Sequence, residues 1–148
     1  MVKGLARLRA QFGAVPEIVR SELVVSMERA ANKLVREIRA LIPRRSGALA
    51  ATVGWTWGAV PRGSLVVARS SRGAGYGRIV LKIYVGNSDL VATGRGTLAD
   101  LARWQEFGTR RMAANPYFYP VIRANRSNLR SSLRSAIARA NRKLKTVK

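Results

Sequence analysis

Eight apolar residues recur with helical spacing over sixteen positions, and a proline follows them directly. Because residues three and four apart lie on one face of a helix, this pattern predicts a long amphipathic helix packed against a core. Pro16 and Glu17 suit its first turn, and Pro43 ends it because a residue before proline is pushed out of the α region. A seam with a partner helix is the alternative. The apolar residues are Met27, Ala30, Ala31, Leu34, Val35, Ile38, Leu41 and Ile42.

The patterning after this helix changes from helical to strand-like. Ser46 is expected to cap a short helical turn that runs through Leu49. Runs rich in β-branched and aromatic residues then predict three strands, the first two joined by a turn at 61–64. The predicted strands are 52–60, 65–69 and 78–85, and one face of the third carries Ile79, Leu81, Ile83 and Val85.

Gly73, Gly75 and Gly77 alternate in the segment between the second and third predicted strands. A phosphate-binding loop would need a lysine followed by serine or threonine, with a helix behind it, and neither is present. We therefore expect a long, mobile hairpin tip rather than a nucleotide site.

Two further helices are predicted in the last third of the chain. Thr97 and Asp100 form a capping-box-like start for a helix that ends at Phe107, where Gly108 is a natural C′ residue. A final helix is expected to begin within 115–120 and to continue into the low 140s.

The order of these elements predicts one α+β domain. It consists of a long N-terminal helix, an antiparallel strand meander with a long Gly-rich hairpin, a short helix and a long basic C-terminal helix. The domain spans residues 1–148, with 1–14 and 144–148 as flexible extensions. Because 47% of the residues are apolar, the chain can bury a real core and is not a disordered basic tail.

The charge of the chain constrains its partners. The formal net charge is +21, and residues 107–148 contain eleven Lys or Arg without an Asp or Glu. Such a charge opposes compaction through self-repulsion, so we expect a chain that binds a polyanion or an acidic surface, or that works inside an assembly.

Two residue types that are common in catalytic sites, histidine and cysteine, are absent from the sequence. The chain has no His and no Cys, and only seven carboxylates, so no Ser-His-Asp arrangement, thiol nucleophile or Cys-based metal site can be built. We predict neither an enzyme nor a cofactor. No apolar run approaches a membrane span and no secretory signal is evident, so an intracellular protein without a membrane partner is expected.

Arginines recur along the final helix beside its apolar stripe. No acid lies within four positions to balance them, which favours contact with DNA or an acidic protein over a merely solvated face. DNA contacts would be to phosphates, because no base-reading motif is present. The stripe is Ile122, Leu129, Leu133, Ile137, Ala140 and Leu144. The arginines assigned to the contact surface are Arg123, Arg126, Arg130, Arg134, Arg110 and Arg111.

The aromatic residues allow more than one interpretation. Trp55 and Trp57 alternate in a predicted strand, so both project from one face, into the core or into a subunit interface. Trp104 and Phe107 are three apart and are expected to anchor their short helix to the core. A cluster between two prolines is expected to fix the start of the final helix: Tyr117, Phe118 and Tyr119.

Three parts of the chain, within residues 30–125, are similar to a family pattern. The first is the long helix followed by Pro43, with Ser46 where threonine is usual, Gly47 and Leu49. The second is the strand segment ending at Gly86. The third and most specific consists of Trp104, Glu106, Phe107, Gly108, Thr109, Asn115, Pro116 and Pro120, with Tyr117 where phenylalanine is common. Together they resemble the tail-completion, or head–tail joining, family of long-tailed bacteriophages, which includes the Z-type minor tail proteins.

The resemblance implies a structural protein of the virion neck, at the head–tail junction, assembled in the host cytoplasm. Such proteins form rings, with a hexamer favoured here and a dodecamer as the alternative. Implied partners are the adaptor, stopper, tail terminator and tail tube proteins, and packaged double-stranded DNA. The Gly-rich hairpin, with Arg72 and Tyr76, would reach a neighbouring subunit, as would Trp55 and Trp57. The rival hypotheses are a sequence-independent nucleic-acid-binding protein of nucleoid or ribosome type, and an adaptor module for one acidic protein.

Overall fold

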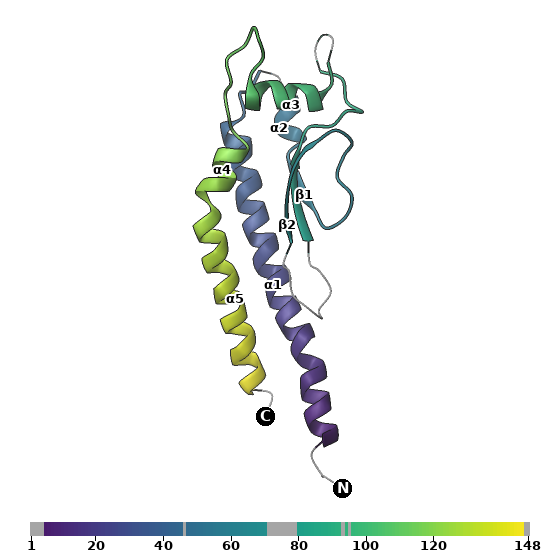
Figure 1. Ribbon diagram of the computed structural model, residues 1–148, viewed down its shortest axis with the longest axis vertical. Coiled ribbons are helices and arrows are strands. Elements are labelled where there is room, and N and C mark those ends of the chain that lie inside the picture. Colours follow the sequence, from purple (N-terminus) through teal and green to yellow (C-terminus); the bar gives the residue numbers. More distant parts are fainter. Residues whose placement is uncertain (1–4, 46, 71–79, 93, 95, 147–148) are drawn as a thin grey trace.

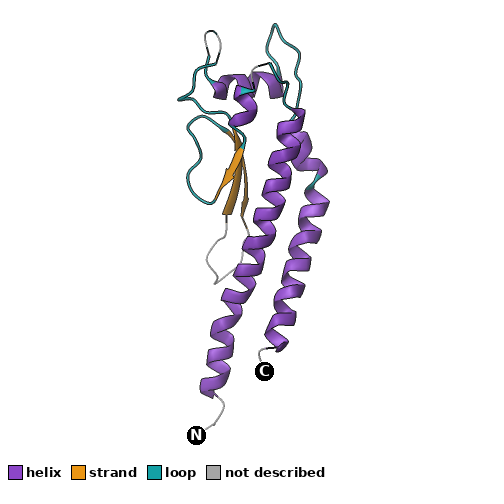
Figure 2. Ribbon diagram, turned by 180° about the vertical axis from the view of Figure 1, so that it is seen from behind, coloured by secondary structure: helices purple, strands orange, loops and turns teal. Residues whose placement is uncertain are grey.

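The computed structural model describes residues 5–45, 47–70, 80–92, 94 and 96–146. Two long helices, α1 (Leu5–Leu41) and α5 (Arg126–Thr146), lie side by side and run in opposite directions (Figure 1). A small sheet covers part of α1, and short helices close the end of the molecule away from the termini (Figure 2). The α+β class predicted from the sequence is confirmed.

Helix α1 forms the spine of the core. Its apolar face is buried as predicted, with Ile38 fully inaccessible, but Leu41 at the end of the face is 57% exposed. The helix ends before Pro43, as expected, and begins at Leu5 rather than at Pro16. Pro16 and Glu17 are preferred in a first helical turn, but they do not require a helix to begin there. The residues before Pro16 are mostly good helix formers, so the helix includes them.

A short helix, α2 (Ala48–Ala51), follows the end of α1. Its N-cap is Gly47, whose φ of 74° is left-handed, and no side chain caps the helix. The predicted cap, Ser46, lies outside the described residues. A glycine takes this position because it adopts positive φ without a steric cost.

The sheet contains β1 (Gly54–Thr56), β2 (Leu65–Ser70) and β3 (Val80–Val85) in the antiparallel order β1-β3-β2. Trp55 pairs with Ile83, so β1 lies beside β3 and not beside the strand that follows it in sequence. The meander prediction was wrong in this pairing. The predicted alternation of β3 is confirmed at Leu81, Ile83 and Val85, which are buried. Ile79, Arg72, Tyr76 and the three alternating glycines lie outside the described residues.

Strand β1 is much shorter than the predicted 52–60. The Thr56 hydroxyl accepts a hydrogen bond from the Gly58 backbone N–H at 3.0 Å, which turns the chain after three strand residues. The indole N–H of Trp57 then donates to Glu28 of α1 at 3.2 Å. These side-chain contacts end the strand where propensity alone would extend it.

Helix α3 (Leu98–Phe107) has the predicted boundaries and the predicted capping box. The Thr97 hydroxyl accepts from the Asp100 N–H at 3.2 Å, and the Asp100 carboxylate accepts from the Thr97 N–H at 3.0 Å. The backbone hydrogen bond from Thr97, followed by the one from its hydroxyl, holds the pKa of Asp100 below its ordinary value. Gly108 ends the helix with a φ of 76°.

The predicted final helix is two helices, α4 (Tyr119–Ala124) and α5, separated at Asn125. Asn125 is buried, and its amide donates to Glu37 of α1 and to the Val121 carbonyl. This polar side chain at the helix–helix contact fixes the break, which an apolar periodicity cannot reveal.

The predicted stripe of α5 is confirmed only in part. Ala140 is fully buried as predicted and Leu129, Leu133 and Leu144 are half-buried, but Ile137 is 43% exposed, and Ala136, which lies outside the predicted stripe, is fully buried. Small residues allow α5 to approach α1 closely, and the Ser26 and Ser132 hydroxyls lie 2.8 Å apart across this seam. Packing therefore selects the small residues for the helix contact and leaves larger aliphatic residues at its edge.

Candidate functional site

Glu106 holds together the segment that resembles the family pattern. Its side chain is only 3% exposed, and its carboxylate accepts three backbone N–H groups at the start of α4. The donors are Tyr117 at 2.8 Å, Phe118 at 2.9 Å and Tyr119 at 3.0 Å. These are N–H groups that the beginning of a helix leaves without partners, and the anion also complements the helix dipole.

The aromatic cluster after this loop is structural. Tyr117 and Phe118 are fully buried, and the Tyr117 hydroxyl donates to the Ala102 carbonyl at 3.2 Å. Burial, with a smaller contribution from the Glu106 charge, raises the pKa of Tyr117 above its ordinary value. The Asn115 N–H donates to the Gln105 carbonyl at 2.8 Å, closing the loop onto α3. The prediction that these aromatics fix the start of the last helical segment is confirmed.

Trp104 and Phe107 do not anchor α3 to the core, contrary to expectation. Trp104 is 41% exposed and Phe107 is 61% exposed. The buried face of the helix is formed instead by its other side: Leu98, Ala99, Ala102 and Glu106. A spacing of three places two residues on one face, but it does not decide which face the core takes.

Other large apolar side chains near α3 are also exposed, and no sequence pattern predicted their exposure. Leu90 and Val91 precede the helix, and Met112 follows it in a turn closed by a bridge between Thr109 and Met112. These residues, together with Trp104 and Phe107, are exposed apolar side chains on or next to α3, and the set is here called the α3 surface. In the sequence these residues share only their apolar character, which does not distinguish an exposed residue from a core residue.

The basic residues near the C-terminus fall into two sets. Arg139 and Lys143 bind the Glu22 carboxylate of α1, at 3.1 Å and 2.5 Å, and so tie α5 to α1. These two contacts, the one to Lys143 first, hold the pKa of Glu22 below its ordinary value. The four predicted contact arginines of α4 and α5 are exposed, and no carboxylate among the described residues pairs with them.

These four arginines line one shallow groove of about 440 Å³, here called the arginine groove. Arg123 comes from α4, and the others follow at intervals of four on α5. Two serines also line the groove. The polar residues of the groove are Arg123, Arg126, Ser127, Arg130, Ser131 and Arg134.

The structure does not bring the other two predicted contact arginines into this groove. Arg110 and Arg111 are exposed in the turn between Thr109 and Met112, beyond the end of α3. They therefore lie beside the α3 surface, and their assignment to a DNA or acidic-protein contact stays a prediction.

Trp55 and Trp57 pack against the core from its edge. Their rings meet edge-to-face with centroids 6.0 Å apart. The Trp55 indole N–H donates to Asn32 of α1 at 2.8 Å, and Trp57 donates to Glu28 of the same helix. Both side chains are partly exposed, so they contribute to the fold and retain surface for a neighbour.

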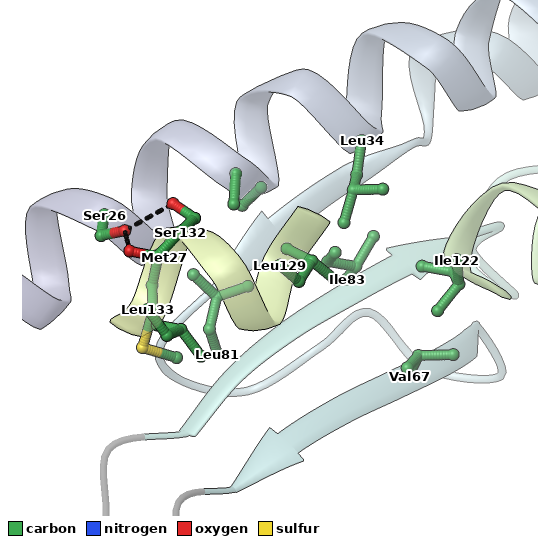
Figure 3. A pocket seen from close by; sticks show the side chains of 12 residues that line it. Ser26, Met27, Leu34, Val67, Leu81, Ile83, Ile122, Leu129, Ser132 and Leu133 are labelled. Atoms are coloured by element: carbon green, nitrogen blue, oxygen red, sulfur yellow. Dashed lines mark hydrogen bonds between the residues drawn. The ribbon is translucent and has the colours of Figure 1, made fainter. Parts of the chain in front are cut away.

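An apolar hollow of about 60 Å³ separates the sheet from the α1–α5 pair. Figure 3 shows side chains from the helices and the strands around it, including Leu129 and Leu133 of α5 and Leu81 of β3. Apart from Ser26 and Ser132, its lining is entirely apolar. It is a feature of packing between layers, and no sequence pattern predicted it.

No cluster of three or more metal-ligating side chains occurs in the described part of the chain. None of the helices in the same ranges is long and apolar enough to cross a lipid bilayer.

Comparison with known proteins identifies the family. Residues 6–108 match the model of the HK97-gp10-like family, described as "Bacteriophage HK97-gp10, putative tail-component". No curated protein and no solved structure gives a significant match. The matched residues extend from α1 to Gly108 and include Trp104, Glu106 and Phe107, whereas the arginine groove lies beyond them. The chain belongs to the HK97-gp10-like family of bacteriophage tail components, a membership that indicates a structural role in the virion.

Proposed function

We propose that this protein forms a ring at the phage neck that completes the tail and joins it to the DNA-filled head. The observation that carries the proposal is the family match over 6–108, which includes the buried Glu106 that accepts three backbone hydrogen bonds. A hexamer is the favoured ring and a dodecamer the alternative. The adaptor, stopper, tail terminator and tail tube proteins are the candidate neighbours.

The exposed apolar side chains support assembly. A ring requires two different surfaces on each subunit, one complementary to the other, because its contacts are head-to-tail. We assign the α3 surface, centred on Trp104 and Phe107, to contact with the next copy of this chain. Large aromatic residues are enriched at the centres of such interfaces. Trp55 and Trp57 are proposed for the complementary side, together with the Gly-rich segment that contains Arg72 and Tyr76.

The proposal is tested by electron microscopy of particles assembled with and without this chain. We expect separate tails and DNA-filled heads to accumulate when the chain is absent, or joined particles to leak DNA. Normal, joined particles without it would overturn the neck assignment.

The assembly surface needs its own measurement. Native mass spectrometry of the purified chain with its tail partners should show a ring, and Phe107→Ser should shift it toward smaller species. Ile137→Ser is the matched control, because it removes an exposed apolar residue from α5, away from α3. Equal effects of the two substitutions, or a wild-type chain that stays monomeric with its partners, would contradict the assigned surface.

The rival function is sequence-independent nucleic-acid binding outside a virion. The four arginines of the arginine groove favour it, whereas the family membership favours the tail. A chain that binds duplex or RNA tightly and is absent from purified particles would support the rival.

A further inference from the structure

We propose that the arginine groove binds the phosphate backbone of double-stranded DNA without regard to base sequence. This deepens the proposed neck role, on which its biological meaning depends, by naming the partner of one surface. The binding itself can be tested on the isolated chain.

The first argument is the absence of internal partners. All seven carboxylates of the chain lie in the described residues, and none pairs with Arg123, Arg126, Arg130 or Arg134. Arg139 and Lys143 of the same helix share Glu22, so ion pairing is available on α5 where the fold uses it. The like charges of the four arginines that line the groove repel one another, and an anion in the groove would reduce that repulsion.

The second argument is the chemistry of the lining. Interfaces between proteins are centred on apolar and aromatic anchors, and arginine contributes there beside such anchors. The groove offers arginine and serine side chains with Ala124 as its only apolar residue. Arginine forks and serine hydroxyls are typical contacts to phosphate oxygens. This lining suits phosphate better than an acidic protein surface.

The third argument is spacing. Arg126, Arg130 and Arg134 are four residues apart, which corresponds to a rise of about 6 Å along a helix. One DNA strand carries a charge about every 3.4 Å along the duplex axis, and because the strand also winds around that axis, neighbouring phosphates lie roughly 7 Å apart along the strand. A helix aligned with one strand can therefore place successive arginines near neighbouring phosphates.

The same features select duplex over single-stranded nucleic acid. Proteins that hold single strands usually stack bases on aromatic side chains, and no aromatic residue lines the groove. Asparagine and glutamine, which read adenine edges, are also missing from its lining, and the arginines and serines present bind phosphates, which carry no sequence information. Binding should therefore be insensitive to sequence, as a conduit for packaged DNA requires.

The groove is positioned by the buried contact at the helix break. Asn125 donates to Glu37 and to the Val121 carbonyl, and so fixes α4 relative to α5 and to α1. Arg123 precedes this residue and Arg126 follows it. The break that interrupts the predicted single helix thus sets where Arg123 stands relative to the row on α5.

The test measures affinity for DNA as a function of salt concentration. The full chain is titrated onto labelled 30-base-pair duplexes of two unrelated sequences, and compared with the triple variant Arg126→Gln, Arg130→Gln, Arg134→Gln. Because each phosphate contact contributes about 0.9 to the slope of log K against log salt, loss of three contacts should lower the slope by about 2.7. At about 100 mM salt the affinity should fall at least tenfold for both sequences.

A control variant removes the same charge elsewhere. Arg36→Gln, Arg44→Gln and Arg62→Gln change three exposed arginines outside the groove and should lower the slope much less. The variant Arg126→Lys, Arg130→Lys, Arg134→Lys keeps the charge and should retain most of the wild-type slope. Equal losses in the two glutamine variants would overturn the site, because the binding would then depend only on total charge.

Poly-glutamate separates DNA from an acidic protein partner. If the groove glutamine variant loses poly-glutamate binding but keeps its DNA affinity and salt slope, the proposal is wrong and the partner is acidic protein. Failure here is distinct from failure of the neck role, which is judged by particle joining. Wild-type joining with no groove-dependent DNA binding would reject only this inference.

Discussion

The α3–α4 junction and the arginine groove contrast in how their charged groups are satisfied. At the junction, a buried carboxylate accepts three backbone hydrogen bonds from Tyr117, Phe118 and Tyr119. In the groove, four exposed guanidinium groups have no carboxylate partner among the described residues. Both regions were noticed in the sequence as distinctive, but only one of them is explained by the fold.

This difference distinguishes charged residues that stabilise the fold from charged residues that are available to bind a partner. A charged residue whose hydrogen-bonding capacity is filled within the subunit, such as Glu106, is accounted for by stability. Charged residues that meet in a groove without a counter-ion are accounted for by neither packing nor local structure, and they indicate an external partner. Substitutions should accordingly reduce stability at the first region and leave it nearly unchanged at the second.

The largest expected effect is at Glu106. Glu106→Ala leaves three backbone donors without their acceptor, and each such buried group costs about 1–3 kcal/mol. We expect a loss of about 3–5 kcal/mol in the free energy of unfolding, measured by urea denaturation followed by circular dichroism. Asp89→Ala, which removes an exposed carboxylate, is the control and should change stability by less than about 0.5 kcal/mol. A loss at Glu106 no greater than at Asp89 would remove the structural explanation of the junction.

The next effect is at Gly86, which packs against α3. Its φ is 89°, and a Cβ atom there would lie 2.9 Å from the Ala99 Cα and 3.1 Å from the Ala102 Cβ. Gly86→Ala should therefore cost about 2–4 kcal/mol in unfolding free energy, because the backbone of α3 must move. Gly47→Ala is the matched control, since its φ is 74° with nothing within 4 Å of the added atom. It should cost only about 1 kcal/mol from backbone strain. Similar losses at both positions would show that close packing of α3 contributes little.

A smaller effect distinguishes the two sides of α5. Ala136→Leu inserts a large side chain into the α1–α5 seam, where Ala136 is fully buried, and should cost about 1–3 kcal/mol. Ala138→Leu makes the same change on the exposed side and should stay within about 0.5 kcal/mol. Thermal unfolding of the two variants gives the comparison. If Ala138→Leu proved the more damaging, the assignment of the buried face of α5 would be wrong.

The smallest effect concerns pH and the ion pairs of Glu22. Hydrogen bonds from Lys143 and Arg139 lower the pKa of Glu22 in the folded chain below its ordinary value of 4.5. The stabilisation is therefore complete above the ordinary value and is lost as the pH falls through the lowered one. Melting temperatures measured between about pH 6 and pH 3 should fall more steeply for the wild type than for Glu22→Gln. Glu17→Gln, an exposed residue of the same helix, should follow the wild type.

Much of the fold was predicted correctly from local sequence patterns. The end of α1 before Pro43, the Thr97–Asp100 capping box and the alternation of β3 were predicted correctly because each depends on neighbours in sequence. Errors arose where partners distant in sequence decide. The pairing of β1 with β3, the break at Asn125 and the exposure of Trp104 each depend on which surface packs against which.

The candidate site was likewise predicted only in part from the sequence. Helical geometry placed three arginines of α5 in one row with Arg123 close by, and all four line one groove in the structure. Arg110 and Arg111, which share only the charge and not the helix, lie outside it. The α3 surface was missed, because the same apolar residues would serve equally well as core until their burial is known.

The sequence by itself determined the α+β class, the main helices, the charge and the membership of a phage tail family, because these follow from local periodicity, composition and short-range motifs. The tertiary structure alone decided which charged groups find partners. Glu106 meets N–H groups eleven to thirteen residues away, and Glu22 meets Arg139 and Lys143 at the other end of the chain. Side chains so distant in sequence are brought together only by the packing of the elements that carry them, and the arginines left without a partner become recognisable as a surface only then.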